Sequence, residues 1–326
     1  MSAPARSSSV EEVANAVLYE GYLLYPYRHT AVKNRQRFNF GLVYPRAFSD
    51  VEGPDNPWFM ETQCLVVSDG LPPHVDLTVR FLAPIERIDS AGAVTHKLST
   101  QEAVEREMKV PGMELGQLEH TPSDLSFFWK ETEETEQGVT RRHPRLKASI
   151  RVRVADRDGA EWRLSVRVEN HSPFEFVGGG DRDAVLVRTF ASTHMILKAT
   201  EGRFVSLTDP PEHLRAMAAA CENRGVWPVL AGDETREDTL LAAPIILYDY
   251  PQIAPESPGD LFDGTEIDEI LTLRILTLTD EEKAEVRRGD GRAKELLERT
   301  EQLGPEHLMR LHGVLRPVDG NGGGRI

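Results

Sequence analysis

Strict alternation of apolar and polar residues between positions 147 and 168 is the clearest structural signal in the chain. In KASIRVRV (147–154) and in EWRLSVRV (161–168), every second residue is apolar, and most residues between them are arginine or serine. Successive side chains of a strand point to opposite faces. With DRDG (156–159) as the turn, the pattern predicts a β-hairpin that has one apolar face and one arginine-rich face in solvent.

Weaker patterns predict further elements on both sides of this hairpin. Alternation in VDLTVRF predicts a half-buried strand over residues 75–81. Apolar runs predict the other strands, at 37–43, 61–68, 184–190, 194–200, 243–248 and 270–278. Apolar residues at helical spacing predict helices at 10–22, 209–225, 280–289, 292–303 and 305–315. Two capping boxes support helix starts, Asp209 with Glu212 and Thr279 with Glu282.

The order of these elements predicts an α+β fold. Strands fill the first two thirds of the chain, so we expect an antiparallel β-sandwich or barrel-like core with helices mainly in the C-terminal third. Residues 10–316 are predicted to form a single globular domain between a disordered N-terminus (1–9) and a flexible C-terminal tail (317–326). The charged stretch 130–144 is predicted to be an exposed loop.

Composition narrows the classes of protein. The chain has 326 residues, 40% of them hydrophobic, and a formal net charge of -15. These values are typical of a soluble protein and argue against a dedicated nucleic-acid binder, which needs positive potential on its docking face. No signal peptide and no run of 18 apolar residues is present. We therefore expect a cytoplasmic protein without membrane insertion.

Sequence motifs of catalysis are missing. The chain has no G-x-G-x-x-G before a helix, no P-loop, no G-x-S-x-G and no H-E-x-x-H. Its two cysteines, Cys64 and Cys221, are isolated and are expected to be packed as reduced thiols. The sequence therefore predicts no cofactor and no catalytic residue, and it carries no signal for an oligomeric state.

Two segments have a one-sided charge. Between Glu20 and Asp50 there is no carboxylate, and the segment LLYPYRHTAVKNRQRFNF (23–40) alternates cations with aromatic rings. Between Glu237 and Leu273 there is no lysine, arginine or histidine. Opposite potentials tend to meet within a fold or to face complementary partners. We expect both segments on one side of the molecule, with at least one cation of the first paired to the second. The candidate partner-binding residues are Tyr25, Tyr27, Arg28, Lys33, Arg35, Arg37, Asp260, Asp263 and Glu266.

A metal site is the alternative interpretation of the acidic segment. DLFDGTEIDE (260–269) lacks the spacing of an EF-hand calcium loop. His194 lies in the apolar segment ASTHMIL and is expected to be buried, more often as a hydrogen-bonded core histidine than as a ligand. A metal-dependent enzyme or a metal-delivery protein would use Asp260, Asp263 and Glu266 with such a histidine.

Two longer blocks carry a resemblance to a known family. VLYEGYLLYPYRHTAVKNRQRFNFG and YPQIAPESPGDLFDGTEIDEILTLRILTLTDEEKAE resemble the signature blocks of an uncharacterised family encoded in the [NiFe]-hydrogenase gene clusters of actinobacteria and some other bacteria. The resemblance implies an accessory protein in hydrogenase assembly or maturation, with a hydrogenase subunit or a maturation protein as its partner. It implies no known activity. It points to residues 25–37 and 255–269 as the segments that matter.

Overall fold

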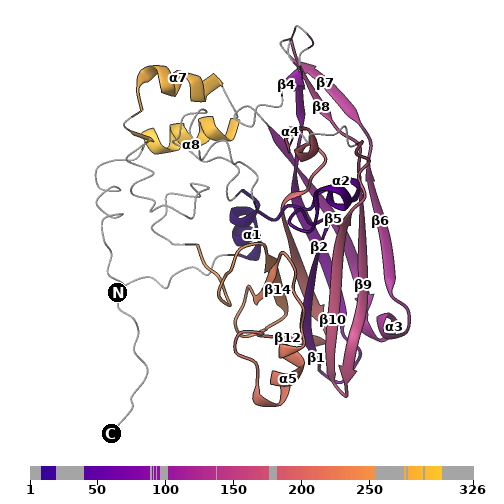
Figure 1. The fold of residues 1–326 in the computed structure, drawn as a ribbon. Helices are drawn as coiled ribbons and strands as arrows, with labels where there is room; N and C mark the ends of the chain where they lie inside the picture. Colours follow the sequence, from indigo (N-terminus) through magenta and orange to yellow (C-terminus); the bar gives the residue numbers. More distant parts are fainter. Residues whose placement is uncertain are drawn as a thin grey trace, which may run out of the picture.

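Antiparallel strands form most of the structure, in three sheets, none of which closes on itself among the described residues (Figure 1). The computed structural model describes residues 9–19, 40–88, 90, 92, 94–95, 102–136, 138–175, 182–253, 275–276, 278–288 and 291–302. The predicted antiparallel sheets are therefore confirmed, and the barrel-like alternative does not fit the sheets that are described.

Sheet I and sheet II have five strands each, and sheet III is smaller. Sheet I has the order β12 (Gly202–Val205), β1 (Phe59–Ser68), β10 (Glu161–Asn170), β9 (Leu146–Asp158) and β6 (Ser123–Trp129). Sheet II has the order β13 (Trp227–Leu230), β14 (Thr239–Ala243), β11 (Ala191–Thr200), β2 (His74–Pro84) and β5 (Ala103–Glu114). Sheet III has the order β4 (Val94–Thr95), β3 (Glu86–Ile88), β8 (Val139–His143) and β7 (Thr132–Glu136).

Helices occur along the whole described chain, so their predicted concentration in the C-terminal third is not confirmed. The helical elements are α1 (Val10–Tyr19), α2 (Arg46–Glu52), α3 (Leu115–His120), α4 (Arg182–Leu186), the 3-10 turn η3 (Glu212–Leu214), α5 (Arg215–Ala219), α7 (Asp280–Arg288) and α8 (Gly291–Glu301). No helix of the described residues is long and apolar enough to cross a membrane.

The main core lies between the inner faces of sheets I and II. Inward-pointing residues of the predicted hairpin, such as Val152 and Trp162, share one hydrophobic cluster with residues of sheet II, such as Leu77 and Phe81. Phe81 is fully buried, and its ring centroid lies 5.5 Å from that of Trp129 on β6. Burying a side chain of this size stabilises the fold by about 1.5–3 kcal/mol. The apolar half of each alternating strand thus drives the two sheets together.

Helix α1 covers part of the outer face of sheet II. A capping box begins it, in which Ser9 and Glu12 exchange backbone-to-side-chain hydrogen bonds. Val17 packs in a cluster with Leu241 of β14, and Leu18 packs in another with Leu82 of β2. The predicted helix is confirmed up to Tyr19. The predicted tails, 1–9 and 317–326, lie outside the described residues except for Ser9.

The segment 130–144, predicted to be an exposed loop, instead forms the β7–β8 hairpin. Two of its cross-strand pairs join opposite charges, Glu133 with Arg142 and Glu134 with Arg141, and Arg142 Nε lies 2.6 Å from Glu133 Oε1. Opposite charges facing each other across a strand pair stabilise the pairing. Gly138 supplies the positive φ of 79° at the turn. The prediction was wrong because a charged composition is equally compatible with a strand whose partners carry the opposite charge.

Other predicted elements change type or length. Residues 184–190, predicted to be a strand, are helix α4 followed by a turn. The helix predicted over 209–225 is only η3 with α5. The strand predicted over 243–248 ends at Ala243. Most of the strand predicted over 270–278 lies outside the described residues.

Candidate functional site

The two segments that the sequence singled out, 25–37 and 255–269, lie outside the described residues. The predicted partner-binding residues all lie outside the described residues: Tyr25, Tyr27, Arg28, Lys33, Arg35, Arg37, Asp260, Asp263 and Glu266. Their expected place on one side of the molecule therefore stays a prediction. Of the singled-out residues, His194 is described.

His194 is a buried, neutral histidine on the outer side of β11. It is fully buried, and its Nδ1 donates a hydrogen bond to the carbonyl oxygen of Ser192 at 2.9 Å. Burial lowers the pKa of His194 to about 4, the Ser192 carbonyl opposes this shift, and the positive charge of Arg80 adds to it. With Nδ1 protonated, Nε2 carries a lone pair that has no partner among the described residues.

A local irregularity sets the orientation of His194. The pairing of β11 with β2 shifts register between Ala191 and His194, and Ser192 has a positive φ of 51°. Gly41 packs so closely here that a Cβ atom on it would meet the backbone nitrogen of Thr193 at 2.8 Å. No group of three His, Cys, Asp or Glu side chains able to hold a metal ion lies in the described part of the chain.

The outer face of sheet I carries cationic and aromatic side chains next to one another. We call it the arginine face and define it as Trp58, Phe59, Glu61, Arg151, Arg153, Arg163, Arg167 and Arg224. On β9 and β10 these are the polar positions of the alternating pattern, so the predicted arginine-rich face is confirmed. The β-strand period of two places them side by side on neighbouring strands.

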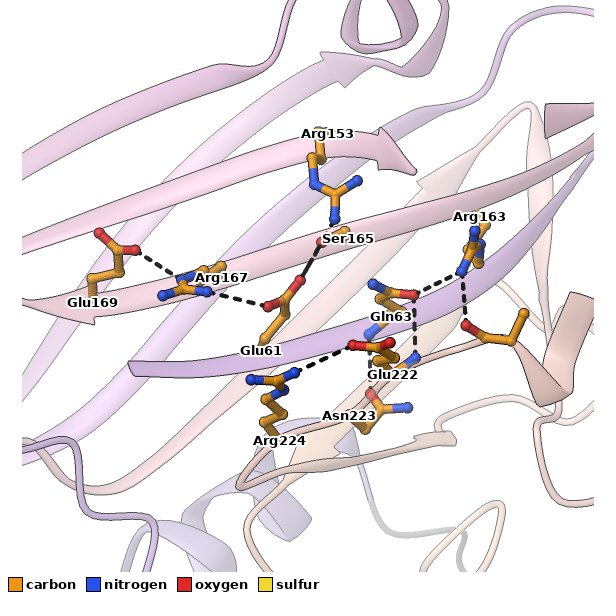
Figure 2. A network of polar contacts seen from close by, with 11 residues as sticks. Glu61, Gln63, Arg153, Arg163, Ser165, Arg167, Glu169, Glu222, Asn223 and Arg224 are labelled. Atoms are coloured by element: carbon orange, nitrogen blue, oxygen red, sulfur yellow. Dashed lines mark hydrogen bonds and ion pairs between the residues drawn. The ribbon is translucent and has the colours of Figure 1, made fainter. Parts of the chain in front are cut away.

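Glu61 is the centre of one half of this face (Figure 2). Its carboxylate lies 3.6 Å from Arg167 Nη1 and 3.9 Å from Arg153 Nη2, and it accepts a hydrogen bond of 2.9 Å from Ser165 Oγ. Arg167 Nε also donates to Glu169 Oε1 at 2.8 Å. One carboxylate thus orients two arginines, and Arg153 keeps 40% of its side chain exposed.

The other half ties residues 220–224 to the edge of β1. Asn223 Oδ1 accepts hydrogen bonds from Thr62 Oγ1 and from the backbone nitrogen of Gln63, at 2.8 and 3.0 Å. Arg163 Nη1 donates to Gln63 Oε1 and to the carbonyl of Ala220, at 3.2 and 2.7 Å (Figure 2). These bonds hold the chain segment that presents Arg224 beside the sheet.

Aromatic rings stand beside these cations. The guanidinium carbon of Arg167 lies 3.5 Å from the ring centroid of Phe59 and 5.3 Å from that of Trp58. Arg46 lies 4.6 Å from the Trp58 centroid. Cations at these distances from an aromatic face are attracted by its negative quadrupole. The stacking fixes the planar groups while leaving Trp58 and Phe59 only half-buried.

Hydrogen bonds keep Glu169, the neighbour of Arg167, ionised. Burial by itself raises the pKa of Glu169, but bonds from His171, Ser149 and Arg167 outweigh it and hold the pKa below its ordinary value. A hydrogen bond to Asp124 likewise raises the pKa of Arg151. Glu169 and Arg151 are therefore both charged at neutral pH.

The arrangement is suited to recognition of carboxylates. Guanidinium groups present planar, paired N–H donors that match a carboxylate, and Arg224 keeps 61% of its side chain exposed. The alternating arginines were visible in the sequence. Trp58, Phe59 and Glu61 were missed as site residues, because only the pairing of β1 with β10 brings them beside those arginines.

No protein-family model matches the chain, and no curated protein matches it.

Proposed function

We propose that this is an accessory protein that acts by binding a partner protein, with the arginine face as its docking surface. The geometry of Arg167 supports this proposal most directly. Glu61 and Glu169 orient its guanidinium group, which stacks on the ring of Phe59. Around it lie exposed arginines and a half-buried tryptophan. Arginine and tryptophan are the residue types most enriched where protein interfaces gain their affinity.

Charge complementarity defines the partner as an acidic protein surface. The arginines of the face pair with exposed carboxylates such as Asp124, Asp156 and Glu222, so an acidic partner binds by replacing these solvent-exposed pairs. Such a local set of pairs favours one orientation of docking. It disfavours nucleic acid, whose phosphates extend well beyond a single face.

The resemblance of the two sequence blocks supports a [NiFe]-hydrogenase subunit or a maturation protein as that partner, in the cytoplasm. Under this proposal the residues 25–37 and 255–269 serve the same partner as the arginine face. The protein then takes part in assembly or maturation without performing a chemical step of its own.

A pulldown with matched variants tests the docking surface. The tagged protein is recovered at low salt from cells that express the hydrogenase, and compared with the triple variant Arg151→Gln, Arg153→Gln, Arg224→Gln. At about 1 kcal/mol for each desolvated arginine contact, the variant should retain the partner at least tenfold less well. Recovery of wild-type complex should also fall as salt is raised.

The control removes the same charge from other surfaces. Lys109→Gln, Arg203→Gln and Arg236→Gln together also remove three cations, and all three side chains are about half exposed or more. This variant should recover the partner like the wild type. Equal loss in both variants would mean that net charge, not the arginine face, governs binding. Recovery of no hydrogenase component by the wild type would contradict the expected partner.

The metal-binding alternative has one supporting observation, the unpartnered Nε2 of buried His194. A neutral imidazole with a free lone pair is the form that binds metal ions. Under this alternative, elemental analysis finds a stoichiometric metal that His194→Ala removes. A metal-free protein that nickel, iron, zinc and calcium all fail to stabilise would exclude it.

A further inference from the structure

Arg106 points between the two large sheets from the edge of sheet II. On β5 the alternate residues Val104, Met108 and Val110 pack against or belong to the main core. Arg106 occupies the same row, and its Cα partner on β2 is Phe81. Cross-strand partners have neighbouring side chains on the same face of a sheet. The Arg106 side chain therefore leaves the strand next to that of the fully buried Phe81.

Across the core from this edge lies β6, the edge strand of sheet I. Trp129 of β6 makes the edge-to-face contact with Phe81, and both Trp129 and Phe127 are only partly buried. Neither β5 nor β6 pairs with a further strand on its outer side among the described residues. Half-buried aromatic rings and one arginine thus line the place where the two sheets end together.

Arg106 has no partner for its charge in the described structure. Its Nε is buried without a hydrogen-bond acceptor, and no described carboxylate lies within ion-pair distance. Burial lowers the pKa of Arg106. A cation that is partly withdrawn from water without a counter-charge destabilises the protein, which marks this position as one that gains from an added anion.

His143 is a second unpartnered group at the same place. Its Nδ1 is buried and has no hydrogen-bond partner. Arg141, two residues before His143 on β8, lies 2.6 Å from Glu102, four residues before Arg106, and this contact brings the end of β8 to the start of β5. Burial lowers the pKa of His143, and the positive charge of Arg106 is the next largest cause. The chain connects them further, because β8 ends at His143 and runs directly into Leu146, the Cα partner of Trp129.

The surrounding carboxylates are already engaged. Glu102 contacts both Arg141 and Arg87, and Glu86 contacts both Arg142 and Arg188. Arg141 and Arg142 also pair with Glu136 and Glu133, so these four arginines share four carboxylates among themselves. Arg106 receives none of the neutralisation.

We propose that Arg106 and His143 form an anion-binding site at the open edge between β5 and β6, for a carboxylate or phosphate group whose apolar body packs on Trp129 and Phe127. Arg106 supplies charge and paired N–H donors, and the N–H group of His143 donates a hydrogen bond to the same anion. The aromatic rims favour a small aryl or alkyl carboxylate over a free phosphate ion. The site is separate from the arginine face and does not depend on the function proposed above.

Thermal unfolding with added anions tests the site. Sodium phosphate and sodium phenylacetate are titrated separately at constant ionic strength and pH 7 into the wild type, Arg106→Met and Arg153→Met. We expect saturable stabilisation of the wild type and of the control Arg153→Met, with at least tenfold weaker binding to Arg106→Met. Tighter binding of phenylacetate than of phosphate identifies a carboxylate with an apolar body, and the reverse order identifies a phosphate site. No saturable stabilisation by either anion would overturn the proposal, as would equal stabilisation of all three proteins.

A histidine titration provides a second readout that needs no folded variant of Arg106. The His143 resonance is followed by NMR in the wild type with and without the anion, and assigned by its absence in His143→Gln. An anion next to Arg106 cancels the charge that lowers the pKa of His143, so this pKa should rise. Glu102, Glu134 and Arg141 also influence His143 and are present in both samples. An unchanged His143 pKa at saturating anion would contradict the site.

Discussion

At the scale of single residues, buried polar groups show what each position requires. Asn170 is fully buried and donates from Nδ2 to the carbonyls of Val43 and Arg188, both at 2.8 Å, while its Oδ1 accepts from the backbone nitrogen of Ser172. The polar atoms of its side chain are thus all hydrogen-bonded, to backbone groups of three segments. His194, Arg106 and His143 each keep one buried nitrogen without a hydrogen-bond partner among the described residues. A buried polar atom without such a partner lowers the stability of the fold.

The buried His194 predicts a loss of stability in mild acid. Its folded pKa of about 4 lies below the unfolded value of about 6.5, so the unfolded chain binds the proton more readily. The stability that comes from keeping His194 neutral is complete above pH 6.5 and is lost as pH falls toward 4. Between pH 7.5 and pH 5 this loss should be about 2 kcal/mol.

Urea unfolding of His194→Gln at both pH values measures this contribution. The variant should lose about 2 kcal/mol less than the wild type between pH 7.5 and pH 5, since glutamine does not titrate. His120→Gln, at an exposed position, serves as the control and should lose as much as the wild type. If His194→Gln and the wild type respond alike, His194 binds its proton equally well in the folded and the unfolded protein, and burial does not lower its pKa.

At the scale of elements, local sequence signals identified some structures and missed others for physical reasons. The capping box of Thr279 and Glu282 was readable because its partners are three residues apart, and both hydrogen bonds are present. The β7–β8 hairpin was missed because charged pairs stabilise it. Helix α4 was missed because apolar residues at 184–190 fit a short buried helix as well as a strand.

Charged pairs in strands should differ strongly in their contribution to stability. Arg142 bonds to Glu133 and also lies 3.1 Å from Glu86, whose side chain is only 9% exposed. Arg142→Ala should destabilise the protein by about 1–3 kcal/mol, because it leaves the buried carboxylate of Glu86 with Arg188, 3.6 Å away, as its remaining partner. Denaturant unfolding at neutral pH measures the change.

Arg151→Ala is the matched comparison. Arg151 makes an equally short contact with Asp124, 2.6 Å, but both side chains are more than half exposed. Solvent screens such a pair, so this variant should cost about 0–1 kcal/mol. Equal costs for the two variants would show that burial of Glu86 does not govern the strength of its pairs.

At the scale of the whole molecule, the sequence predicted the class of fold but not its topology. Alternation revealed antiparallel strands one at a time. It could not reveal that β1 lies between β10 and β12, or β2 between β5 and β11, because pairing between strands far apart in the chain leaves no local pattern. The sequence likewise predicted the arginines of β9 and β10 as the solvent-facing side of a hairpin, but not as a site, and it did not predict the aromatic rings beside them.

The seating of α1 on sheet II makes the N-terminal helix part of the global fold. Leu18 is fully buried in a cluster with Leu82 of β2 and Ala191 of β11. Leu18→Ala should therefore lower the free energy of unfolding by about 2–4 kcal/mol. Leu71→Ala, at a position that is 60% exposed, should change it by less than about 0.5 kcal/mol. A small effect of both substitutions would mean that α1 unfolds separately from the sheets.

The packing of α1 on β14 also delays the folding of this helix during synthesis. Helix α1 leaves the ribosome first, yet the strand that completes its binding surface, β14, ends only at Ala243. At bacterial or eukaryotic elongation rates, the roughly 220 residues between Tyr19 and Ala243 take on the order of ten to forty seconds to make. Throughout that interval Val13 and Val17 lack their native partners on β14, such as Leu241. The newborn chain therefore presents a ready binding segment for chaperones long before it can present its folded surface to a partner.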